Sequence, residues 1–391
     1  MKITAIESLH CDAGWRTLSF LKISTDEGLI GYSEYNESYG SPGLSEVIRR
    51  LGELLIGQDP RPVERISANL YARTRQAPEG LIQQAIAAIE NALLDVKAKA
   101  LGVPVYELFG GPVRDRLRLY WSHFGTYRLH HAAVMGVEPL TDLAGVEKLA
   151  AEAVERGFTA MKTNIFLFDR DGAPDLHMPG FGRRNETPEL NWSRDLIDRL
   201  RQQIAAMRSG AGPAADLLLD LNFNFKTEGY LQITRALDDA GLSWFEIDSF
   251  DPAALRDIRE KTRTPIASCE SLFGRRGFVP YFEQHAMDVA IIDVPWNGLN
   301  ESLKIAAMAE AYEINVAPHN FYGHLSTLMS AHFCAALPNY RIMEIDIEDV
   351  PWKDDLVTEP PRIEAGHLIL PTTPGWGADP DEDAIRAHPP K

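Results

Sequence analysis

The strongest constraint on the fold is a regular alternation of short apolar segments with longer amphipathic segments, beginning near residue 117. A β–α alternation of this kind predicts a parallel sheet, and eight strands favour closure into a (β/α) barrel. A doubly wound open sheet is the alternative, but no GxGxxG or P-loop motif follows any strand. The eight strand-like segments are LRLYWSHF, FTAMKTNIF, DLLLDLNFNF, LSWFEID, PIASCESL, DVAIIDVPW, INVAPHNF and RIMEIDI.

The first third of the chain has a different pattern. The segments 2–9 and 18–25 read as strands, and Asp26-Glu27-Gly28 is a hairpin signal before a further strand-like run. Helices are predicted at 44–55 and 82–101, the second with apolar residues at steps of three and four. We therefore expect a barrel with an added lobe, to which the turn-rich C-terminal stretch PTTPGWGADPDEDAIRAHPPK returns.

Polar or charged residues end the later strands of the predicted barrel. The last six of them are separated by 26, 24, 23, 26 and 25 residues, which is about one βα unit each time. Because the C-terminal ends of barrel strands all face one mouth, we expect these side chains to form a ring there. In chain order they are Lys162, Asp220, Glu246, Glu270, Asp293, His319 and Glu344.

Three consecutive members of this ring, Asp220, Glu246 and Glu270, are carboxylates. Unpaired, three buried anions would repel one another and take up protons. A hard divalent cation removes this conflict, and Mg2+ prefers a small number of carboxylate ligands together with water and substrate. Zinc is disfavoured because no His or Cys joins the set. The alternative is that each acidic residue alone caps the helix that follows it.

The other members of the ring suggest proton transfer. Asp293 lies one βα unit before His319, and a carboxylate beside an imidazole makes a general base or acid near neutral pH. Lys162 is expected to offset the charge of a substrate carboxylate or to act as a base, unless it pairs with a metal carboxylate. Glu344 could donate a hydrogen bond to an oxyanion if protonated, or form a salt bridge. We interpret His324 in HNFYGH as structural or supporting.

These residues resemble the enolase superfamily, mandelate racemase subgroup. The helix ALLDVKAKALGVPVYELFGG and the tail PGWGADPDEDAIRAHP are also similar to that subgroup, so the resemblance covers essentially the whole chain. The motifs that carry it are Lys162, Asp220-x-Asn222, Trp244-Phe245-Glu246, Glu270, Asp293 with Gly298 five residues on, and His319.

The resemblance implies a (β/α)7β barrel, residues 123–366, with an α+β capping domain, residues 1–122, that is completed by residues 367–391. It also implies a Mg2+ cofactor and removal of the proton alpha to a carboxylate through an enediolate. In this reading the three carboxylates bind the metal, Asp293 and His319 form a dyad, Lys162 contacts the substrate carboxylate and Glu344 supports the enediolate. A homo-oligomer is expected as well.

One position departs from the subgroup, which usually has Lys-x-Lys on the second strand. Here the second lysine is replaced by Asn164, which cannot take a proton. A racemase needs a base on each face of the substrate, so the sequence favours a one-base β-elimination, the dehydration of a sugar acid to a 2-keto-3-deoxy acid. The alternatives are an epimerase, racemase or cycloisomerase on a sugar acid or lactone, and a non-catalytic barrel that binds a metal and an acid.

Substrate contacts are expected from several loops and from two asparagines near the metal. The segment 167–192 is too long for an ordinary βα loop and reads as an insertion over the mouth, where His177 could assist. The capping lobe should contribute early loops that include EYNESY. The expected substrate-binding residues are Asn164, Asn222, Trp15, Arg16, Tyr39, Arg183 and Arg184.

The composition limits the classes of binding partner that we expect. Lys plus Arg number 39 and Asp plus Glu number 56, which gives a net charge of −17. Such a surface repels phosphate backbones and anionic lipid, so we expect a small-molecule partner rather than nucleic acid or a membrane. The N-terminus lacks the apolar run of a signal peptide, and three widely separated cysteines fit a reducing cytoplasm.

Overall fold

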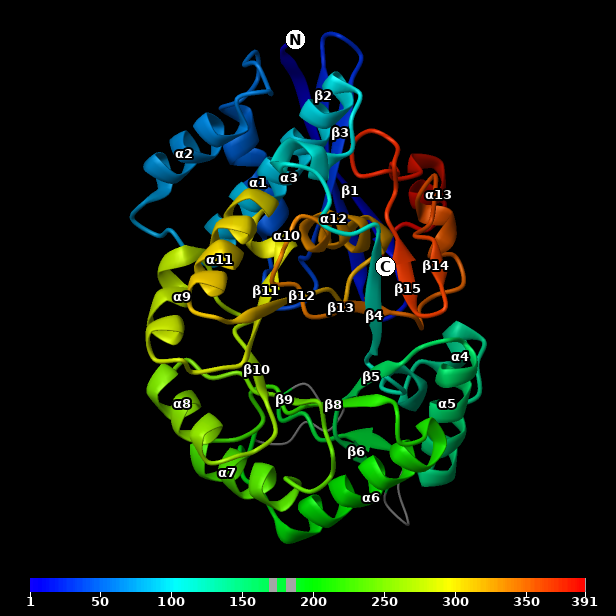
Figure 1. Ribbon diagram of the computed structural model, residues 1–391. Helices are drawn as coiled ribbons and strands as arrows, with labels where there is room; N and C mark the ends of the chain where they lie inside the picture. Colours follow the sequence, from blue (N-terminus) through cyan, green and yellow to red (C-terminus); the bar gives the residue numbers. More distant parts are fainter. Residues whose placement is uncertain (169–173, 181–187, 391) are drawn as a thin grey trace.

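The computed structural model describes residues 1–168, 174–180 and 188–390. An N-terminal lobe, the cap, lies above a barrel in the view of Figure 1. Its antiparallel sheet has the order β1-β2-β3, and its helices pack on one another and on that sheet. The expected turn joins β2 to β3, with Thr25 donating to the carbonyl of Leu29 at 3.1 Å. The elements of the cap are β1 (Ile3–Asp12), β2 (Thr17–Thr25), β3 (Ile30–Tyr35), α1 (Leu44–Glu53), α2 (Val63–Thr74) and α3 (Leu81–Leu101).

The eight predicted strands form one barrel, which confirms the expected fold. Neighbouring strands pair in parallel in the order β4-β5-β8-β9-β10-β11-β12, and β13 pairs with β4. The ring closes between β12 and β13 through a parallel bridge from Val316 to Tyr340. The strands are β4 (Arg116–Ser122), β5 (Ala160–Thr163), β8 (Asp216–Asp220), β9 (Trp244–Glu246), β10 (Ile266–Ser268), β11 (Val289–Asp293), β12 (Asn315–His319) and β13 (Met343–Asp346).

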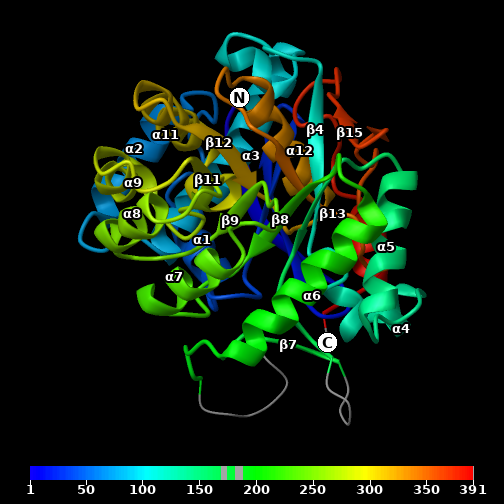
Figure 2. The ribbon, with the colours of Figure 1, turned by 60° about the horizontal axis from the view of Figure 1, so that its bottom comes forward.

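A helix on the outside of the barrel follows each of the first seven strands. Figure 2 shows two of them, α5 and α6, side by side against the sheet. The seven are α5 (Leu143–Glu155), α6 (Arg194–Ala211), α7 (Thr227–Ala236), α8 (Pro252–Glu260), α9 (Gly274–Glu283), α11 (Leu299–Ala311) and α12 (His324–Ala335). The shorter elements are η1 (Val105–Phe109), η2 (Tyr127–Leu129), α4 (Ala132–Met135), β6 (Phe166–Leu167), β7 (Asp175–Leu176), α10 (Val294–Asn297), η3 (Asp354–Leu356), β14 (Ile363–Glu364), β15 (His367–Ile369) and α13 (Glu382–Ala387).

A buried layer inside the barrel sets the direction of the site residues. Tyr120 and Trp244 meet edge to face across it, with ring centroids 5.6 Å apart. Side chains alternate along a strand, so the residue two positions further on faces the same way, one layer nearer the mouth. The layer consists of Tyr120, Ala160, Leu218, Trp244, Ala267, Val289, Ile291, Ala317 and Ile342. Two positions further on stand Ser122, Lys162, Asp220, Glu246, Cys269, Ile291, Asp293, His319 and Glu344.

Glu270 departs from this alternation, because it stands three positions after the layer residue Ala267. A regular strand would therefore turn its side chain outward. Cys269, between the end of β10 and Glu270, has a φ of 92°, which is rare for a residue with a Cβ. This bend in the backbone changes the phase and brings Glu270 to the mouth, where its carboxylate lies 3.6 Å from Nε2 of His319.

The cap holds the loop that follows β12. Glu34, in β3, accepts hydrogen bonds from the backbone N–H groups of Gly323 at 2.6 Å and Ser326 at 2.9 Å. These N–H groups lie at the N-terminal turn of α12, where backbone N–H groups have no acceptor within the helix. A carboxylate from the cap supplies that acceptor. A Cβ at Gly323 would lie 2.8 Å from the Glu34 carboxylate. The backbone after His319 is thereby fixed by the other lobe.

The C-terminal segment contacts both lobes. Trp376 donates from its indole to the carbonyl of Tyr32 in the cap at 2.8 Å. In the same segment β15 pairs antiparallel with β4 of the barrel. The domain boundaries given above stay a prediction.

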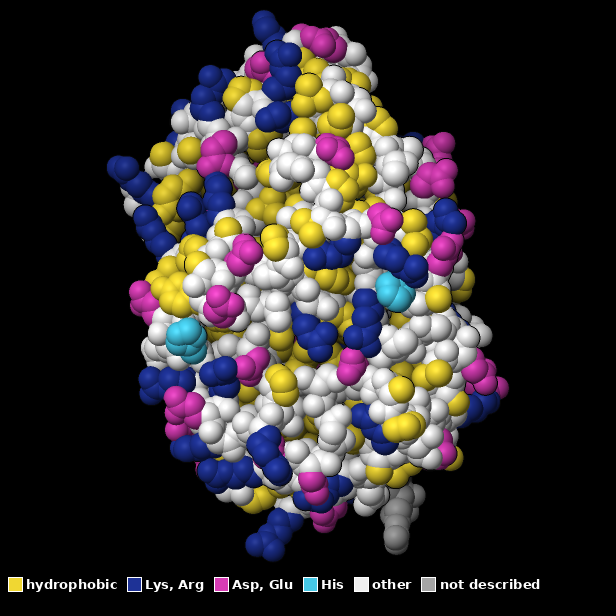
Figure 3. All heavy atoms as spheres, in the orientation of Figure 1, with side chains coloured by type: hydrophobic (Ala, Val, Ile, Leu, Met, Phe, Trp, Pro, Cys, Tyr) yellow, Lys and Arg dark blue, Asp and Glu magenta, His cyan; other side chains and the backbone are white. Residues whose placement is uncertain are grey.

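On the face drawn in Figure 3, acidic and basic side chains are interspersed rather than gathered in one patch. Over the ranges that the structure covers, we find no helix with the length and apolarity that a membrane crossing requires.

Candidate active site

Lys162 is the centre of a buried cluster of carboxylates. Its Nζ lies 2.7 Å from Glu246, 2.9 Å from Glu344 and 3.5 Å from Asp220. Burial alone would lower the pKa of this ammonium group, but the carboxylates of Glu246 and Glu344 outweigh it and hold the pKa well above its usual range. In this structure Lys162 is therefore a paired cation. Its two predicted roles, as a base and as a cation that offsets the charge of a substrate carboxylate, stay predictions.

The donor chemistry of the site fits Mg2+. Asp220 and Glu246 are in register at the ends of neighbouring strands. Burial raises the pKa of both, and each is raised further by the charge of Glu270. This mutual repulsion is what a divalent cation removes. Within the described residues, no three such side chains are already arranged to hold an ion. Binding by all three therefore requires a side chain to turn, and Lys162 is the group that now contacts two of them.

His319 and Asp293 form the predicted pair at the ends of β12 and β11. Nδ1 of His319 lies 2.6 Å from Oδ2 of Asp293. The same carboxylate accepts a hydrogen bond from the Tyr322 hydroxyl at 2.5 Å and, through Oδ1, from the Trp296 N–H at 2.8 Å. With Nδ1 held by this fully buried carboxylate, Nε2 of His319 faces the mouth. The arrangement suits an imidazole that exchanges a proton there.

Glu344 is held as a carboxylate. Besides Lys162, it accepts hydrogen bonds from the Ser122 hydroxyl and, at 2.6 Å, from the Asn320 N–H. Burial would raise its pKa, but the charges of Lys162 and His319 lower the pKa to about 2. Of the two roles considered, the structure contains the salt bridge to Lys162.

The two asparagines expected to bind substrate lie beside the metal carboxylates. Asn164 donates to the Asn222 side chain at 3.3 Å and accepts from the Thr126 hydroxyl at 2.8 Å. Asn222 has a φ of 43°, and its N–H donates to Asp220 at 2.9 Å. Both amides are therefore oriented by neighbours, which suits contacts with substrate hydroxyl groups.

The cap supplies an aromatic edge near His319. The Tyr39 ring lies 6.0 Å from Phe321, whose ring lies 5.0 Å from that of His319. Trp15 accepts a hydrogen bond from the Tyr39 hydroxyl through its carbonyl at 3.2 Å, and its own ring stacks on His131 at 4.7 Å. These contacts place both aromatic residues of the predicted set at the junction of cap and barrel.

Arg16 does not match the role predicted for it. Its guanidinium is buried and forms ion pairs with Asp349 at 2.5 Å and Asp346 at 3.2 Å. It also donates to the Tyr127 hydroxyl at 3.2 Å. Sequence reasoning expected a substrate contact, but these barrel carboxylates already neutralise its charge. Arg16 therefore fastens the cap to the end of β13.

Part of the insertion lies outside the described residues, and Arg183 and Arg184 are in that part. The described part contacts the loop after Asp220. The ring of His177 stacks on Phe225 at 5.3 Å, and its carbonyl accepts from the Asn224 side chain at 3.1 Å. His324 bonds to Asp354 at 2.6 Å, in keeping with a structural role.

Sequence reasoning missed several residues of the site. Asp248 is buried, its pKa is raised by burial and by the charge of Glu270, and its Oδ2 has no hydrogen-bond partner in the described structure. It stands two positions after Glu246, and that spacing was the available signal. Tyr322, three residues after His319, gave no such signal. A polar residue, His123, also follows the first barrel strand, and sequence reasoning did not name it.

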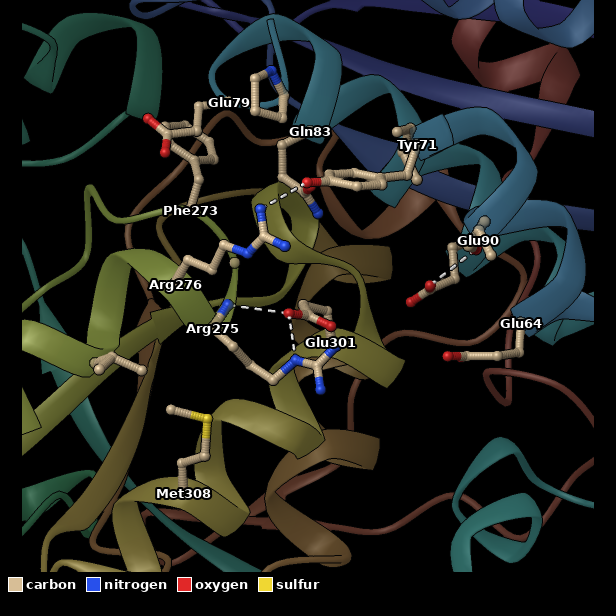
Figure 4. A pocket seen from close by; sticks show the side chains of 16 residues that line it. Glu64, Tyr71, Glu79, Gln83, Glu90, Phe273, Arg275, Arg276, Glu301 and Met308 are labelled. Atoms are coloured by element: carbon tan, nitrogen blue, oxygen red, sulfur yellow. Dashed lines mark hydrogen bonds and ion pairs between the residues drawn. The ribbon is translucent and has the colours of Figure 1, made fainter. Parts of the chain in front are cut away.

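A separate hollow of 690 Å3 lies between cap helices α2 and α3 and barrel helices α9 and α11. None of the residues discussed above lines it. Its arginines are paired, Arg275 with Glu301 at 2.9 Å and Arg276 with the Tyr71 hydroxyl at 3.1 Å (Figure 4). The chemistry of the mouth is absent there, so we place the active site at the mouth.

Comparison with known proteins decides the family. Residues 145–384 match the family described as enolase C-terminal domain-like. Residues 8–110 match the mandelate racemase / muconate lactonizing enzyme N-terminal domain. The chain belongs to the enolase superfamily, in its mandelate racemase subgroup. This confirms the resemblance inferred from the sequence, and the protein is an enzyme of that superfamily.

Relatives of this superfamily member carry two kinds of name. A D-xylonate dehydratase of Haloferax volcanii is 29% identical over 99% of this chain and 89% of its own length. A D-galactonate dehydratase of Ralstonia nicotianae is 28% identical over 98% and 94%. A crystal structure from Burkholderia xenovorans strain LB400 is 52% identical, with a TM-score of 0.97 over 100% of this chain and 96% of that one. It has the provisional name L-alanine-DL-glutamate epimerase and contains magnesium and fumarate.

Proposed function

We propose that this enzyme is a Mg2+-dependent dehydratase that converts a sugar acid to a 2-keto-3-deoxy acid. The single observation that carries the proposal is the His319–Asp293 pair at 2.6 Å beside the three carboxylates, with an asparagine where the subgroup has a second base. The relatives named D-xylonate and D-galactonate dehydratases support the substrate class.

Asp220, Glu246 and Glu270 would hold the metal. When bound, Mg2+ supplies positive charge that stabilises the negative charge on the substrate carboxylate, an effect of several kcal/mol. The structure from Burkholderia xenovorans, which contains magnesium, supports this cofactor. Lys162 already contacts Asp220 and Glu246, so its ammonium group lies where it can also offset charge on the substrate.

His319 would carry the proton. Its Nε2 takes the proton alpha to the carboxylate, and the electron pair of the broken C–H bond moves into the enediolate. The bond from the β-carbon to its hydroxyl then breaks. The hydroxyl leaves as water after taking a proton, which the His319 imidazolium can return. The enol product then becomes the 2-keto-3-deoxy acid. Asp293 holds the imidazole with Nε2 toward the substrate throughout.

The second candidate is an epimerase, and the provisional name of the 52% identical structure favours it. Epimerisation requires a proton donor on the face opposite His319. Asn164 cannot provide one, and Lys162 forms ion pairs with Glu246 and Glu344 at 2.7 and 2.9 Å. These contacts favour elimination, and the substrate remains a small acid under either candidate.

The test is to incubate the enzyme with Mg2+ in D2O and with each of four acids in turn: D-xylonate, D-galactonate, D-gluconate and L-alanine-D-glutamate. We expect at least one sugar acid to give a 2-keto-3-deoxy product, detected by NMR. Epimerised dipeptide without any keto acid would refute the dehydratase.

His319→Asn tests the role of the imidazole with the same assay. We expect loss of alpha-proton exchange by at least about 100-fold, since general base catalysis contributes about 10²- to 10⁴-fold. Exchange at the wild-type rate would remove His319 from the mechanism.

The expected cytoplasmic localisation and the expected homo-oligomeric state stay predictions.

A further inference from the structure

A second histidine–aspartate pair lies in the barrel mouth. His123 follows β4, and its Nδ1 lies 2.9 Å from Oδ1 of Asp346, the last residue of β13. Asp346 is in register with Ser122, so the pair joins the first and last strands of the barrel. Its geometry repeats that of His319 and Asp293: an imidazole at one strand end is held through Nδ1 by a buried carboxylate from the neighbouring strand end.

The ring of His123 is fixed on several sides. Its backbone has a φ of 45°, and its carbonyl accepts from the Thr126 N–H at 2.8 Å. The Tyr127 ring stacks on it, with centroids 4.9 Å apart, while the Tyr127 hydroxyl donates to Asp346 at 2.8 Å. A left-handed backbone at a residue other than glycine costs about 1 kcal/mol or more and persists where the surroundings impose it. The sequence thus keeps a strained histidine in a defined orientation.

The free nitrogen of His123 is available to a substrate. Within the part of the chain that the structure describes, no protein group bonds to Nε2, and 22% of the side chain is exposed. Asp346, by contrast, is fully buried. An imidazole whose Nδ1 bonds to a carboxylate presents Nε2 as its reactive atom.

His123 also lies close to the proposed chemistry. The Phe321 ring is 6.1 Å from the ring of His123 and 5.0 Å from that of His319, so one side chain separates the two imidazoles. Around the barrel, only β13 lies between the strands that carry the two histidines.

We propose that His123 is a further catalytic residue, which donates the proton that the departing β-hydroxyl of the sugar acid needs, while His319 removes the alpha proton. The proposal rests on the proposed dehydratase function and divides its two proton transfers between two imidazoles. The N–H bond at Nε2 breaks, an O–H bond forms on the hydroxyl, and water leaves as the bond to the β-carbon breaks. His319 releases the alpha proton to solvent, and His123 regains one from solvent. Asp346 is the positioning residue for His123.

The test compares two steps of one reaction in His123→Asn. Asparagine tolerates a left-handed backbone, so the variant should fold. His285→Asn is the matched control, because His285 has a φ of 47° and precedes β11 at the opposite end of the barrel. On the sugar acid that the wild type dehydrates, we expect His123→Asn to keep alpha-proton exchange within about threefold and to lose dehydration by at least about 100-fold. His285→Asn should change neither rate.

A substrate that needs no proton on its leaving group gives a second, independent readout. Fluoride departs without one, so the 3-deoxy-3-fluoro analogue of the same acid should restore most of the lost rate in His123→Asn. Dehydration by His123→Asn at the wild-type rate, or an equal loss of both steps with no recovery on the fluoro analogue, would overturn the proposal. If the wild type dehydrates none of the sugar acids, the proposed function itself fails, and this result is distinct from either of the other two.

Discussion

Glu90 offers a test of the structure that does not depend on catalysis. It lies in α3 facing the hollow between cap and barrel (Figure 4), and its side chain is almost completely buried. The carboxylate accepts hydrogen bonds from the Ser67 hydroxyl and the Asn300 N–H, both at 3.0 Å, and no cation pairs with it among the described residues. Burial raises the pKa of Glu90 to about 7. We predict that Glu90→Gln stabilises the protein at alkaline pH.

The sign follows from proton binding. Between pH 4.5 and about 7 the folded chain binds a proton at Glu90 that the unfolded chain has lost. Stability therefore falls as pH rises through this window, because folding must bury an anion. With these two pKa values, burial of the carboxylate costs about 2.5 kcal/mol more at pH 8 than at pH 5, at about 1.36 kcal/mol per pH unit. Glutamine carries no charge at either pH, so the stability of Glu90→Gln does not fall for this reason as the pH rises.

The assay is thermal unfolding of wild type and variant at pH 5 and pH 8. For 391 residues unfolding together, about 2.5 kcal/mol corresponds to about 3 °C, from about 2.1 cal/mol/K per residue. The melting temperature of Glu90→Gln relative to wild type should therefore rise by about 3 °C between the two pH values. Glu79→Gln, at an exposed position beside the same hollow, is the control and should show no such change. A difference for Glu90→Gln that is the same at both pH values would refute the reasoning.

Two further predictions concern the mouth and its connection to the cap. Glu246→Gln removes one carboxylate of the metal set and a partner of Lys162 at 2.7 Å; we expect Mg2+ binding, measured by calorimetry, to weaken by at least about tenfold, since metal ligation depends on ionised oxygen donors. Unchanged affinity would exclude Glu246 as a ligand. Arg16→Met removes a cation from the buried carboxylates Asp346 and Asp349, which keep His123 and Lys353, and we expect a loss of up to about 3 kcal/mol in the free energy of unfolding, because breaking a buried ion pair leaves charge less well compensated. A variant as stable as the wild type would show that Arg16 does not fasten the cap.

The local pattern of the sequence was sufficient for the barrel. Apolar runs with a polar residue at each end repeat once per βα unit, and the alternation of side chains along a strand then fixes which residues reach the mouth. Asp220, Glu246, Asp293 and His319 were found from this recurrence, and in the structure each lies two positions after a buried layer residue. Glu270 was also named, although it reaches the mouth only through the left-handed backbone at Cys269.

The partners of charged side chains could not be predicted in the same way. Arg16 and Asp346 are 330 positions apart, and Lys162 and Glu344 are 182 apart, so no local pattern relates them. Sequence reasoning gave Arg16 to the substrate, and the fold gives it to two carboxylates of the barrel. It also passed over His123, whose orientation depends on Asp346, a residue 223 positions later in the chain.

The sequence by itself determined the periodicity, and through it the architecture and the identity of the side chains at the mouth, because strand phase is a local property of the chain. Only the tertiary structure decided which of these groups are neutralised, which remain free and how they are oriented. Electrostatic energy depends on distances of a few ångströms between atoms, and those distances arise only when the ring of strands closes and the cap is seated on it.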